Sequence, residues 1–312
     1  RSPNDRTGNA LVARSLLVVV PVSGQPAPVR GLVLTLSCKY RPGVVAAISV
    51  HLFEGRFNIR ASQQFDDPTS GRLFARLEFE PIDDREVSVD EAAKGITPLA
   101  ERFQMTWTLK PAHLRMRVLI MVSRYGHCLN DLLYRTSIGA LPIEIAAIVS
   151  NHRDLEPLAA HYGVPFHHVP VSPDTKPEAE QRLLEIIAEE QVELTVLARY
   201  MQILSPEMSR ALSGKAINIH PSMLPSFKGA RPYFQAFDRG VKMVGATAHY
   251  VTDDLDEGPI IEQEIARIDH TMDVAEITAL GRDAECRALA QAVRWHAESR
   301  VVLNDRRSVV FR

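Results

Sequence analysis

The sequence has few cysteines and no long apolar run. Its three cysteines, Cys38, Cys128 and Cys286, lie far apart and form no C-x-x-C pair. This scarcity argues against a disulfide framework and against a zinc site, and it is typical of a protein of the reducing cytoplasm. No stretch reaches the roughly 18 consecutive apolar residues that a membrane-spanning helix needs. We therefore expect a cytoplasmic location and no membrane partner.

Neither sign of charge dominates the chain. The 36 lysines and arginines nearly balance the 38 aspartates and glutamates, giving a net charge of −2. A chain with this balance has no basic footprint for nucleic acid and no polybasic membrane patch. The hydrophobic content of 46% in 312 residues is ordinary for a globular protein, and the length suggests about two domains.

The first residues do not have the pattern of a leader peptide. The run at 10–24 is apolar for only a few residues before Pro21 and Gly24 interrupt it, and the chain opens on Arg1 rather than Met.

The first half of the chain predicts a small α/β domain. Apolar strands alternate with two helical segments, and the turns "RPG" and "DDPTSG" separate them. The resulting order is βαββαβ, which is a ferredoxin-like fold over residues 30–110. The predicted strands are 32–38, 57–65, 73–79 and 104–109, and the predicted helices are 44–54 and 88–103.

The second half predicts a parallel sheet. After a linker at 110–115, continuous apolar strands alternate with helices, and strands without a polar face are typical of a doubly wound, Rossmann-like sheet. Ligands bind beyond the carboxyl ends of such strands. The fold class is therefore α/β, with a Rossmann-like, mostly parallel domain over 116–312. Its predicted strands include 116–123, 143–151, 166–171 and 194–200, and its predicted helices are 128–136 and 176–191.

The stretch "AINIH" at 216–220 carries candidate catalytic residues. Asn218 and His220 are two positions apart on an extended segment, so their side chains share one face. Asp256 follows in the loop after the next strand and could fold back onto the strand ends. An amide can donate to an oxyanion, a histidine can move protons, and an aspartate can orient the imidazole. The chain has no G-x-S-x-G motif, so the trio suits direct attack on an acyl carbon without a covalent intermediate.

The other histidines carry no prediction of chemistry. His113, His152 and His296 are interpreted as structural, and His167 and His168 have no partner at metal-ligand spacing, so no metal site is predicted. His249, on the strand that leads to Asp256, fits either a supporting role or a core position.

Three segments together carry a resemblance. "NIHPSMLPSFKGA", "DDLDEGPII" and "LARYMQILS" resemble enzymes that use 10-formyltetrahydrofolate, which include glycinamide ribonucleotide formyltransferase, methionyl-tRNA formyltransferase and formyltetrahydrofolate deformylase. The resemblance implies a formyltransferase-like domain over 116–312 with Asn218, His220 and Asp256 as catalytic residues. It implies folate-binding residues in two loops: Met201, Gln202, Ile203, Leu204, Val251, Thr252, Asp253, Asp254 and Leu255.

The N-terminal domain resembles an ACT domain, through "LTLSC", "RPGVVAAIS", "FNI" and "SQQFDD". The resemblance implies a regulatory or oligomerisation domain over 30–110. It implies an amino-acid effector near Arg41, Gly43 and Asn58, and a homo-oligomer, either a dimer or a tetramer. The alternative is a dimerisation surface that binds no effector.

The acceptor side of the formyl-transfer site separates the members of this family. The ribonucleotide transferase holds its substrate phosphate on a Gly/Ser/Asn-rich turn after the first strand, whereas "SRYGHCLNDLLYR" has bulky Tyr125, His127 and Leu129 and one glycine. No basic patch for tRNA is present. With the ACT-like domain, "GARPYFQAFDRGVK" and the C-terminal "GRDAECRALAQAVRWHAESRVVLN", the chain resembles formyltetrahydrofolate deformylases along nearly its whole length.

That resemblance implies a hydrolase acting on a linear amide-type C–N bond. It would convert 10-formyltetrahydrofolate to formate and tetrahydrofolate without a cofactor, balancing one-carbon pools and supplying formate for purine synthesis. One departure keeps an alternative open. Pro221 follows the catalytic histidine, as in the transferases, where deformylases often have a second histidine. The alternatives are a formyltransferase with an amine acceptor and a non-catalytic sensor of folate or amino acid.

Overall fold

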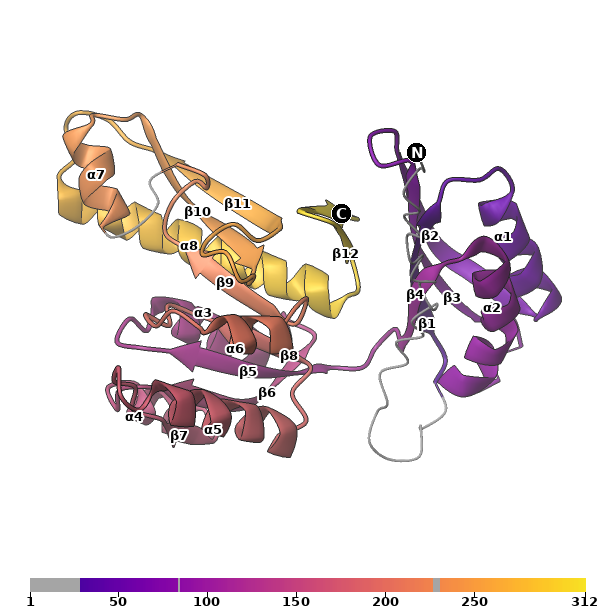
Figure 1. Ribbon diagram of the computed structural model, residues 1–312, viewed down its shortest axis with the longest axis horizontal. Helices are drawn as coiled ribbons and strands as arrows, with labels where there is room; N and C mark the ends of the chain where they lie inside the picture. Colours follow the sequence, from indigo (N-terminus) through magenta and orange to yellow (C-terminus); the bar gives the residue numbers. More distant parts are fainter. Residues whose placement is uncertain (1–28, 84, 227–230) are drawn as a thin grey trace, which may run out of the picture. The chain divides into compact units, whose positions relative to one another are not determined.

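The computed structural model describes residues 29–83, 85–226 and 231–312 (Figure 1). The apolar run at 10–24 and the Lys228–Gly229 step of the loop after His220 lie outside these residues. The chain divides into two compact units between Ala112 and His113. Among the described helices, none combines the length and the apolar character that crossing a lipid bilayer requires.

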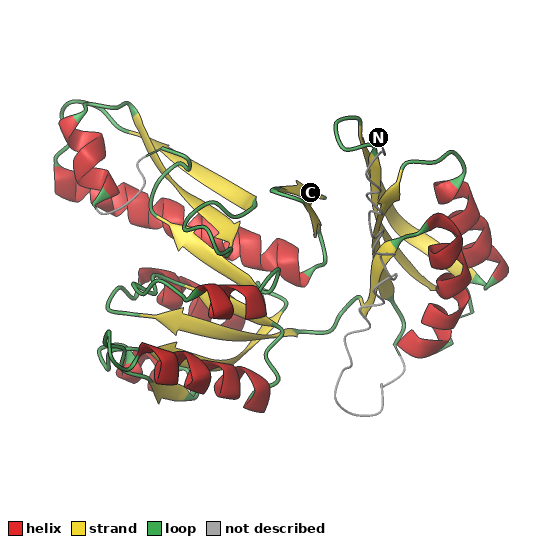
Figure 2. Cartoon of the chain, viewed as in Figure 1, coloured by secondary structure: helices red, strands yellow, loops and turns green. Residues whose placement is uncertain are grey.

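The N-terminal unit is a four-stranded antiparallel sheet with two helices. The strand order is β2-β3-β1-β4, and the elements follow the order βαββαβ, which confirms the predicted ferredoxin-like fold. Both helices lie on one face of the sheet (Figure 2). The elements are β1 (Leu32–Lys39), α1 (Val44–Glu54), β2 (Phe57–Asp67), β3 (Arg72–Pro81), α2 (Val89–Phe103) and β4 (Thr106–Pro111).

The alternation of β1 builds the core of this unit. Leu32, Leu34 and Leu36 point to one face and are fully buried against the helices. Each buried leucine contributes about 1.5–3 kcal/mol relative to an exposed one. Each helix is preceded by a residue that suits a helix start. Gly43 takes the left-handed conformation before α1, and the Ser88 hydroxyl caps the first turn of α2.

The C-terminal unit is a seven-stranded sheet in the order β11-β10-β9-β8-β5-β6-β7. The five strands β5 to β9 pair in parallel, whereas β10 and β11 run antiparallel to their neighbours. This arrangement confirms the predicted Rossmann-like fold with a mostly parallel sheet. The strands are β5 (Met116–Val122), β6 (Ile143–Ser150), β7 (Phe166–His168), β8 (Leu194–Leu197), β9 (Ala216–His220), β10 (Met243–Tyr250) and β11 (Ile260–Arg267).

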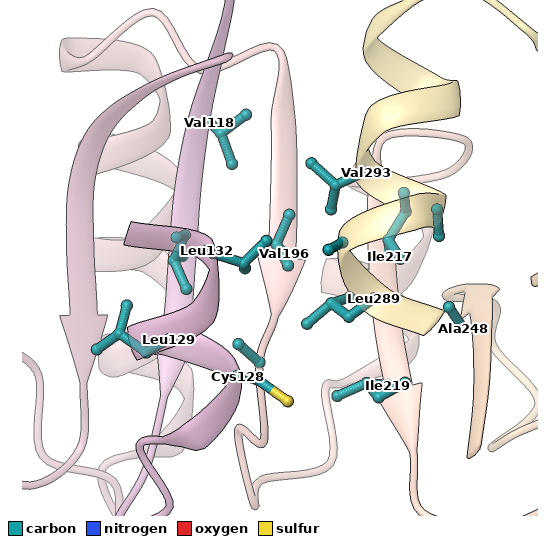
Figure 3. Close-up of a cluster of buried hydrophobic side chains, with 14 of the residues drawn as sticks. Val118, Cys128, Leu129, Leu132, Val196, Ile217, Ile219, Ala248, Leu289 and Val293 are labelled. Carbon is teal, nitrogen blue, oxygen red and sulfur yellow. The ribbon is translucent and has the colours of Figure 1, made fainter. Parts of the chain in front are cut away.

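Helices cover both faces of this sheet, so the central strands are buried on both sides. In β5, Val118 and Ile120 pack with α3 and α8, whereas Leu119 and Met121 pack with α5 and α6. Figure 3 shows part of the first of these two clusters. The remaining elements are α3 (His127–Ser137), α4 (Glu156–His161), α5 (Lys176–Glu189), α6 (Pro206–Ala211), α7 (Pro232–Asp238), α8 (Val274–Ala297), β12 (Val301–Asn304) and β13 (Arg307–Val310).

Three neighbouring parallel strands end at the same edge of the sheet. Ser123 follows β5, Ala198 follows β8, and His220 is the last residue of β9. In open parallel sheets, ligands bind outside the carboxyl ends of the strands. The fold therefore places "AINIH" where a ligand would bind.

Candidate active site

Strand β9 positions Asn218 and His220. The strand lies between β8 and β10, with Asn218 opposite Leu197 on one side and His249 on the other. Because side chains alternate along a strand, Asn218 and His220 share one face. His220 is buried and Asn218 is half-buried.

Asp256 reaches this strand because the backbone of its turn folds back on itself. Its φ is 56°, in the left-handed region that few residues other than glycine adopt. The amide of Tyr250 donates to the carbonyl of Pro259, and a Cβ at Gly258 would lie 1.7 Å from the Tyr250 oxygen. Oδ2 of Asp256 consequently lies 3.2 Å from Nδ1 of His220. The structure thus brings the three sequence-predicted residues together.

His249 is a fourth member of this group, and the sequence left it open between a supporting role and a core position. Its Nε2 lies 3.2 Å from Nδ2 of Asn218 and 3.7 Å from Oδ1 of Asp256. Burial lowers its pKa, against the smaller raising effects of the Tyr250 carbonyl and of Asp256, so the ring is neutral at neutral pH. The signal that could have found it is register, because β10 places it directly opposite Asn218.

The tautomer of His249 fixes the orientation of the Asn218 amide. Nδ1 of His249 lies 2.9 Å from the carbonyl oxygen of Tyr250, which can only accept, so Nδ1 carries the proton. Nε2 of the neutral ring is then an acceptor, and an Asn218 N–H donates to it. The second N–H of the amide is available to another acceptor, such as a developing oxyanion.

His220 has one ring nitrogen engaged and one free. Nδ1 faces Asp256, whereas Nε2 is buried and makes no hydrogen bond to any described residue. Buried polar atoms without partners are rare in folded proteins and often mark sites of chemistry. The arrangement presents an oriented imidazole nitrogen and an amide N–H on the same face of β9.

The two loops predicted to bind folate follow β8 and β10. Met201, Ile203 and Leu255 are 57%, 62% and 59% exposed, which is unusual for large apolar side chains in neighbouring loops. Leu204 and Val251 anchor the loops by packing into the core beneath them. Loops of this kind offer apolar surface for a flat ring together with main-chain groups for its polar edge.

The other predicted loop residues hold the second loop in place. The Thr252 hydroxyl donates to the Asp254 carbonyl, and Asp253 pairs with Arg210 of α6 at 3.3 Å. Asp254 lies 3.7 Å from Arg306, and Gln202 is half-buried between Met201 and Ile203.

The turn after β5 is tied to both neighbouring strands. The Ser123 hydroxyl donates to Oδ1 of Asn151 at 2.7 Å and accepts from the amide of Met201 at 3.0 Å. Beyond it, His127, Cys128 and Glu285 are the one group of three potential metal ligands among the described residues. The Nε of Arg199 lies 3.3 Å from the Glu285 carboxylate, and a guanidinium at that distance opposes a cation.

The residues predicted to hold an effector lie on two elements of the N-terminal unit. Arg41 and Gly43 belong to the turn before α1, and Asn58 is the second residue of β2; all three are exposed. Gly43 has φ 89°, and a Cβ there would meet nothing within 4 Å. The backbone conformation at position 43, rather than a close neighbour, therefore explains why a glycine occupies it.

Comparison with known proteins defines the class of the C-terminal unit. Residues 116–293 match the Formyl transferase family. Among solved structures, glycinamide ribonucleotide transformylase 1 from Symbiobacterium toebii is 31% identical with a TM-score of 0.59, and the match covers 64% of this chain and 95% of that one.

Similarity over both units narrows the class. The formyltetrahydrofolate deformylase of a Corynebacterium species is 50% identical, covering 90% of this chain and 98% of the relative. The crystal structure of formyltetrahydrofolate deformylase from Burkholderia mallei is also 50% identical, with a TM-score of 0.87 and coverage of 91% and 100%. The chain belongs to the formyltetrahydrofolate deformylase family.

Proposed function

We propose that this chain hydrolyses 10-formyltetrahydrofolate to formate and tetrahydrofolate. The observation that carries the proposal is the arrangement of Asn218 and His220 of β9, His249 of β10 and Asp256 of the following loop, in a chain whose relatives are named formyltetrahydrofolate deformylase. In the reaction, water forms a new C–O bond to the formyl carbon, the bond from that carbon to N10 breaks, and N10 leaves with a proton.

The exposed apolar side chains would hold the folate. Met201, Ile203 and Leu255 would cover the faces of the pterin ring, while main-chain groups of their loops pair with its amide-like edge. The loop after β8 starts at the edge where β9 ends, and the loop after β10 starts beside Ala216 and folds back until Asp256 reaches His220. A ring held between the two loops would direct the formyl group toward β9.

The polar groups would then divide the chemistry. The second N–H of Asn218 would donate to the formyl oxygen as it becomes anionic. Asp256 would hold the imidazole of His220 and orient the attacking water. Nε2 of His220 would accept the proton that the water loses as the C–O bond forms and pass it to N10 as the C–N bond breaks. His249 would keep the Asn218 amide in its donating orientation.

Pro221 supports a second candidate, transfer of the formyl group to an amine. It follows His220 as in the transferases, and the C-terminal unit resembles a solved glycinamide ribonucleotide transformylase. The bulky turn at Tyr125 and His127 favours hydrolysis over this candidate, because it offers no cradle for a substrate phosphate.

Several finer properties belong to the same proposal. The reaction as written needs no cofactor, and the enzyme would work in the cytoplasm as a homo-oligomer, supplying formate for purine synthesis. The N-terminal unit would be an ACT-like regulatory domain whose turn at Arg41–Gly43 binds an amino acid.

Formate release without any acceptor tests the proposal. Purified protein and 10-formyltetrahydrofolate, with no amine present, should give one formate for each tetrahydrofolate. Asn218→Ala should lower turnover by roughly 10²–10³, since one oxyanion donor is lost. Near-normal turnover of this variant would contradict the proposed site, and an absolute need for an added amine would favour transfer.

A further inference from the structure

A second polar cluster lies in the C-terminal unit, outside the four residues of the candidate active site. Its centre is Glu285 of α8, which is 1% exposed. The Tyr233 hydroxyl donates to Oε1 at 2.6 Å, while Nε2 of His127 lies 3.0 Å and Nε of Arg199 3.3 Å from Oε2. One buried carboxylate thus joins the start of α3, the segment after β8 and the start of α7.

The residues around Glu285 determine whether its carboxyl group is ionised. Burial, the largest influence, raises the pKa of Glu285, but the His127 hydrogen bond, the Arg199 charge and the Tyr233 hydrogen bond together outweigh it, so the pKa is lowered. Burial, with Glu285, raises the pKa of Tyr233 far above its ordinary value, which keeps its hydroxyl a donor. The carboxylate is therefore ionised and its two oxygens are occupied.

The cluster is joined directly to a predicted folate loop. Arg199 lies two residues before Met201 and has φ 66°. The Arg199 carbonyl accepts from the amide of Ser123, whose hydroxyl in turn accepts from the amide of Met201.

The cluster also lies at the level of the catalytic end of β9. Leu289, one helical turn after Glu285 on α8, packs beside Ile219, the residue before His220 (Figure 3). Cys128, the residue after His127, lies in the same group of side chains. Glu285 precedes Leu289 on the same helix face, toward the edge where β9 ends.

Large side chains line this part of the edge. The guanidinium of Arg199 lies 5.4 Å and that of Arg282 5.8 Å from the centroid of the Tyr125 ring, both within cation–π range. Tyr125, His127 and Arg199 thus occupy the space between the turn after β5 and the segment after β8, and Glu285 fixes two of the three.

We infer that the Arg199–Glu285–His127 cluster is a specificity element that excludes an amine acceptor from the formyl site. The inference rests on the proposed function. Water is small enough to reach the formyl carbon past these side chains, whereas a primary amine substrate would need the space that they fill. The cluster contributes to the choice of acceptor and not to the bond-breaking step.

A double substitution, Arg199→Gly with His127→Ser, opens the acceptor side of the formyl site with little backbone strain. Arg199→Gly suits the left-handed conformation at that position, and His127→Ser keeps a small polar residue at the start of α3. The probe is glycinamide, a small primary amine, added with 10-formyltetrahydrofolate. Formate and N-formylglycinamide are quantified by mass spectrometry. Arg153→Ala is the matched control, because its ion pair with Glu156 is exposed.

The expected result is formate alone from the wild type and from the control. The double variant should form N-formylglycinamide, with a ratio of formylated amine to formate raised by roughly 10-fold or more, the scale by which site shape discriminates substrates. In the double variant the Glu285 carboxylate loses Arg199 and His127 as partners. A triple variant that adds Glu285→Gln removes this buried charge, and it is used for the test if the double variant does not fold.

The two proposals fail differently. A wild-type protein that releases no formate without amine would overturn the proposed function and this inference with it. Formate release by the wild type, together with folded variants that form no N-formylglycinamide at any amine concentration, would overturn this inference alone.

Discussion

Two histidine–carboxylate pairs, each with one buried and one half-buried member, lie in the same unit and differ in what surrounds them. Nδ1 of His220 is 3.2 Å from Asp256, and Nε2 of His127 is 3.0 Å from Glu285. The first pair leaves Nε2 of His220 without a hydrogen bond within the described residues. In the second, the Tyr233 hydroxyl donates to the carboxylate, and the Arg199 guanidinium lies 3.3 Å from it without a hydrogen bond from its Nε.

The same residue types therefore serve opposite purposes. Each pair includes or adjoins a buried nitrogen without a hydrogen bond within the described residues, Nε2 of His220 in the first and Nε of Arg199 in the second. The imidazole nitrogen can bind or release a proton, whereas the guanidinium stays charged and acts on Glu285 through its charge. The backbone around the two carboxylates also differs. Asp256 lies in a turn at positive φ, whereas Glu285 lies within the long helix α8. Substitutions in the two pairs should separate activity from stability.

Asp256→Asn should give the largest effect, and on activity. The amide carries no negative charge and so orients and stabilises the imidazole of His220 less well than the carboxylate does. Turnover should therefore fall by roughly 10²–10⁴. The melting temperature should stay near that of the wild type. Formate release and thermal unfolding measured on the same preparation test this, and turnover within a factor of two of the wild type would contradict it.

Glu285→Ala should instead lower stability. It removes the partner of Arg199 and His127 and leaves buried groups unpaired, at a cost of about 3–5 kcal/mol in the free energy of unfolding. Urea unfolding at pH 7 measures the loss. Glu285→Gln, which keeps the shape, is the matched control and should cost less, about 1–3 kcal/mol. Equal losses for both variants would show that packing, not charge, holds the cluster.

The His220–Asp256 pair is easier to predict from the sequence than the His127–Glu285 pair. Asn218 and His220 share a face because strands alternate, and this follows from five residues of sequence. Asp256 was predicted as a loop acid that could fold back onto the strand ends, and through a family resemblance, but no local rule specifies that a loop with φ 56° returns to the strand. His249 needed the antiparallel register of β9 and β10.

The second pair depends on distant contacts. His127 and Glu285 are 158 positions apart, and only the packing of α3 against α8 brings them together. The predicted strands and helices do not include α8, although its start carries a local signal: Asp273 and Glu276 form a capping box. The α/β fold of the C-terminal unit follows from its continuous apolar strands, because the central strands of a parallel sheet are buried on both faces. That of the N-terminal unit follows from the alternation of strands, helices and turns.

Acidification should remove the difference between the wild type and Glu285→Gln. The folded-state pKa of Glu285 is lowered, so the stability it contributes is present above its unfolded-state pKa, about 4.3. That contribution is lost as the pH falls through the folded-state pKa. Urea unfolding of both proteins at pH 7 and at successively lower pH should show the gap closing, and a gap that widens would contradict the assignment.

The smallest effect is expected in the loop that carries Asp256. Arg210 pairs with Asp253 at 3.3 Å, and its side chain is 60% exposed, so the pair contributes at most about 1 kcal/mol. Arg210→Ala should loosen the loop over the folate, raising KM by no more than about 5-fold with kcat unchanged, since Asp256 still reaches His220. Steady-state kinetics of formate release separate the two constants, with Arg182→Ala, an exposed arginine of α5, as the control. A fall in kcat with KM unchanged would mean that the loop positions Asp256 for the reaction rather than covering the substrate.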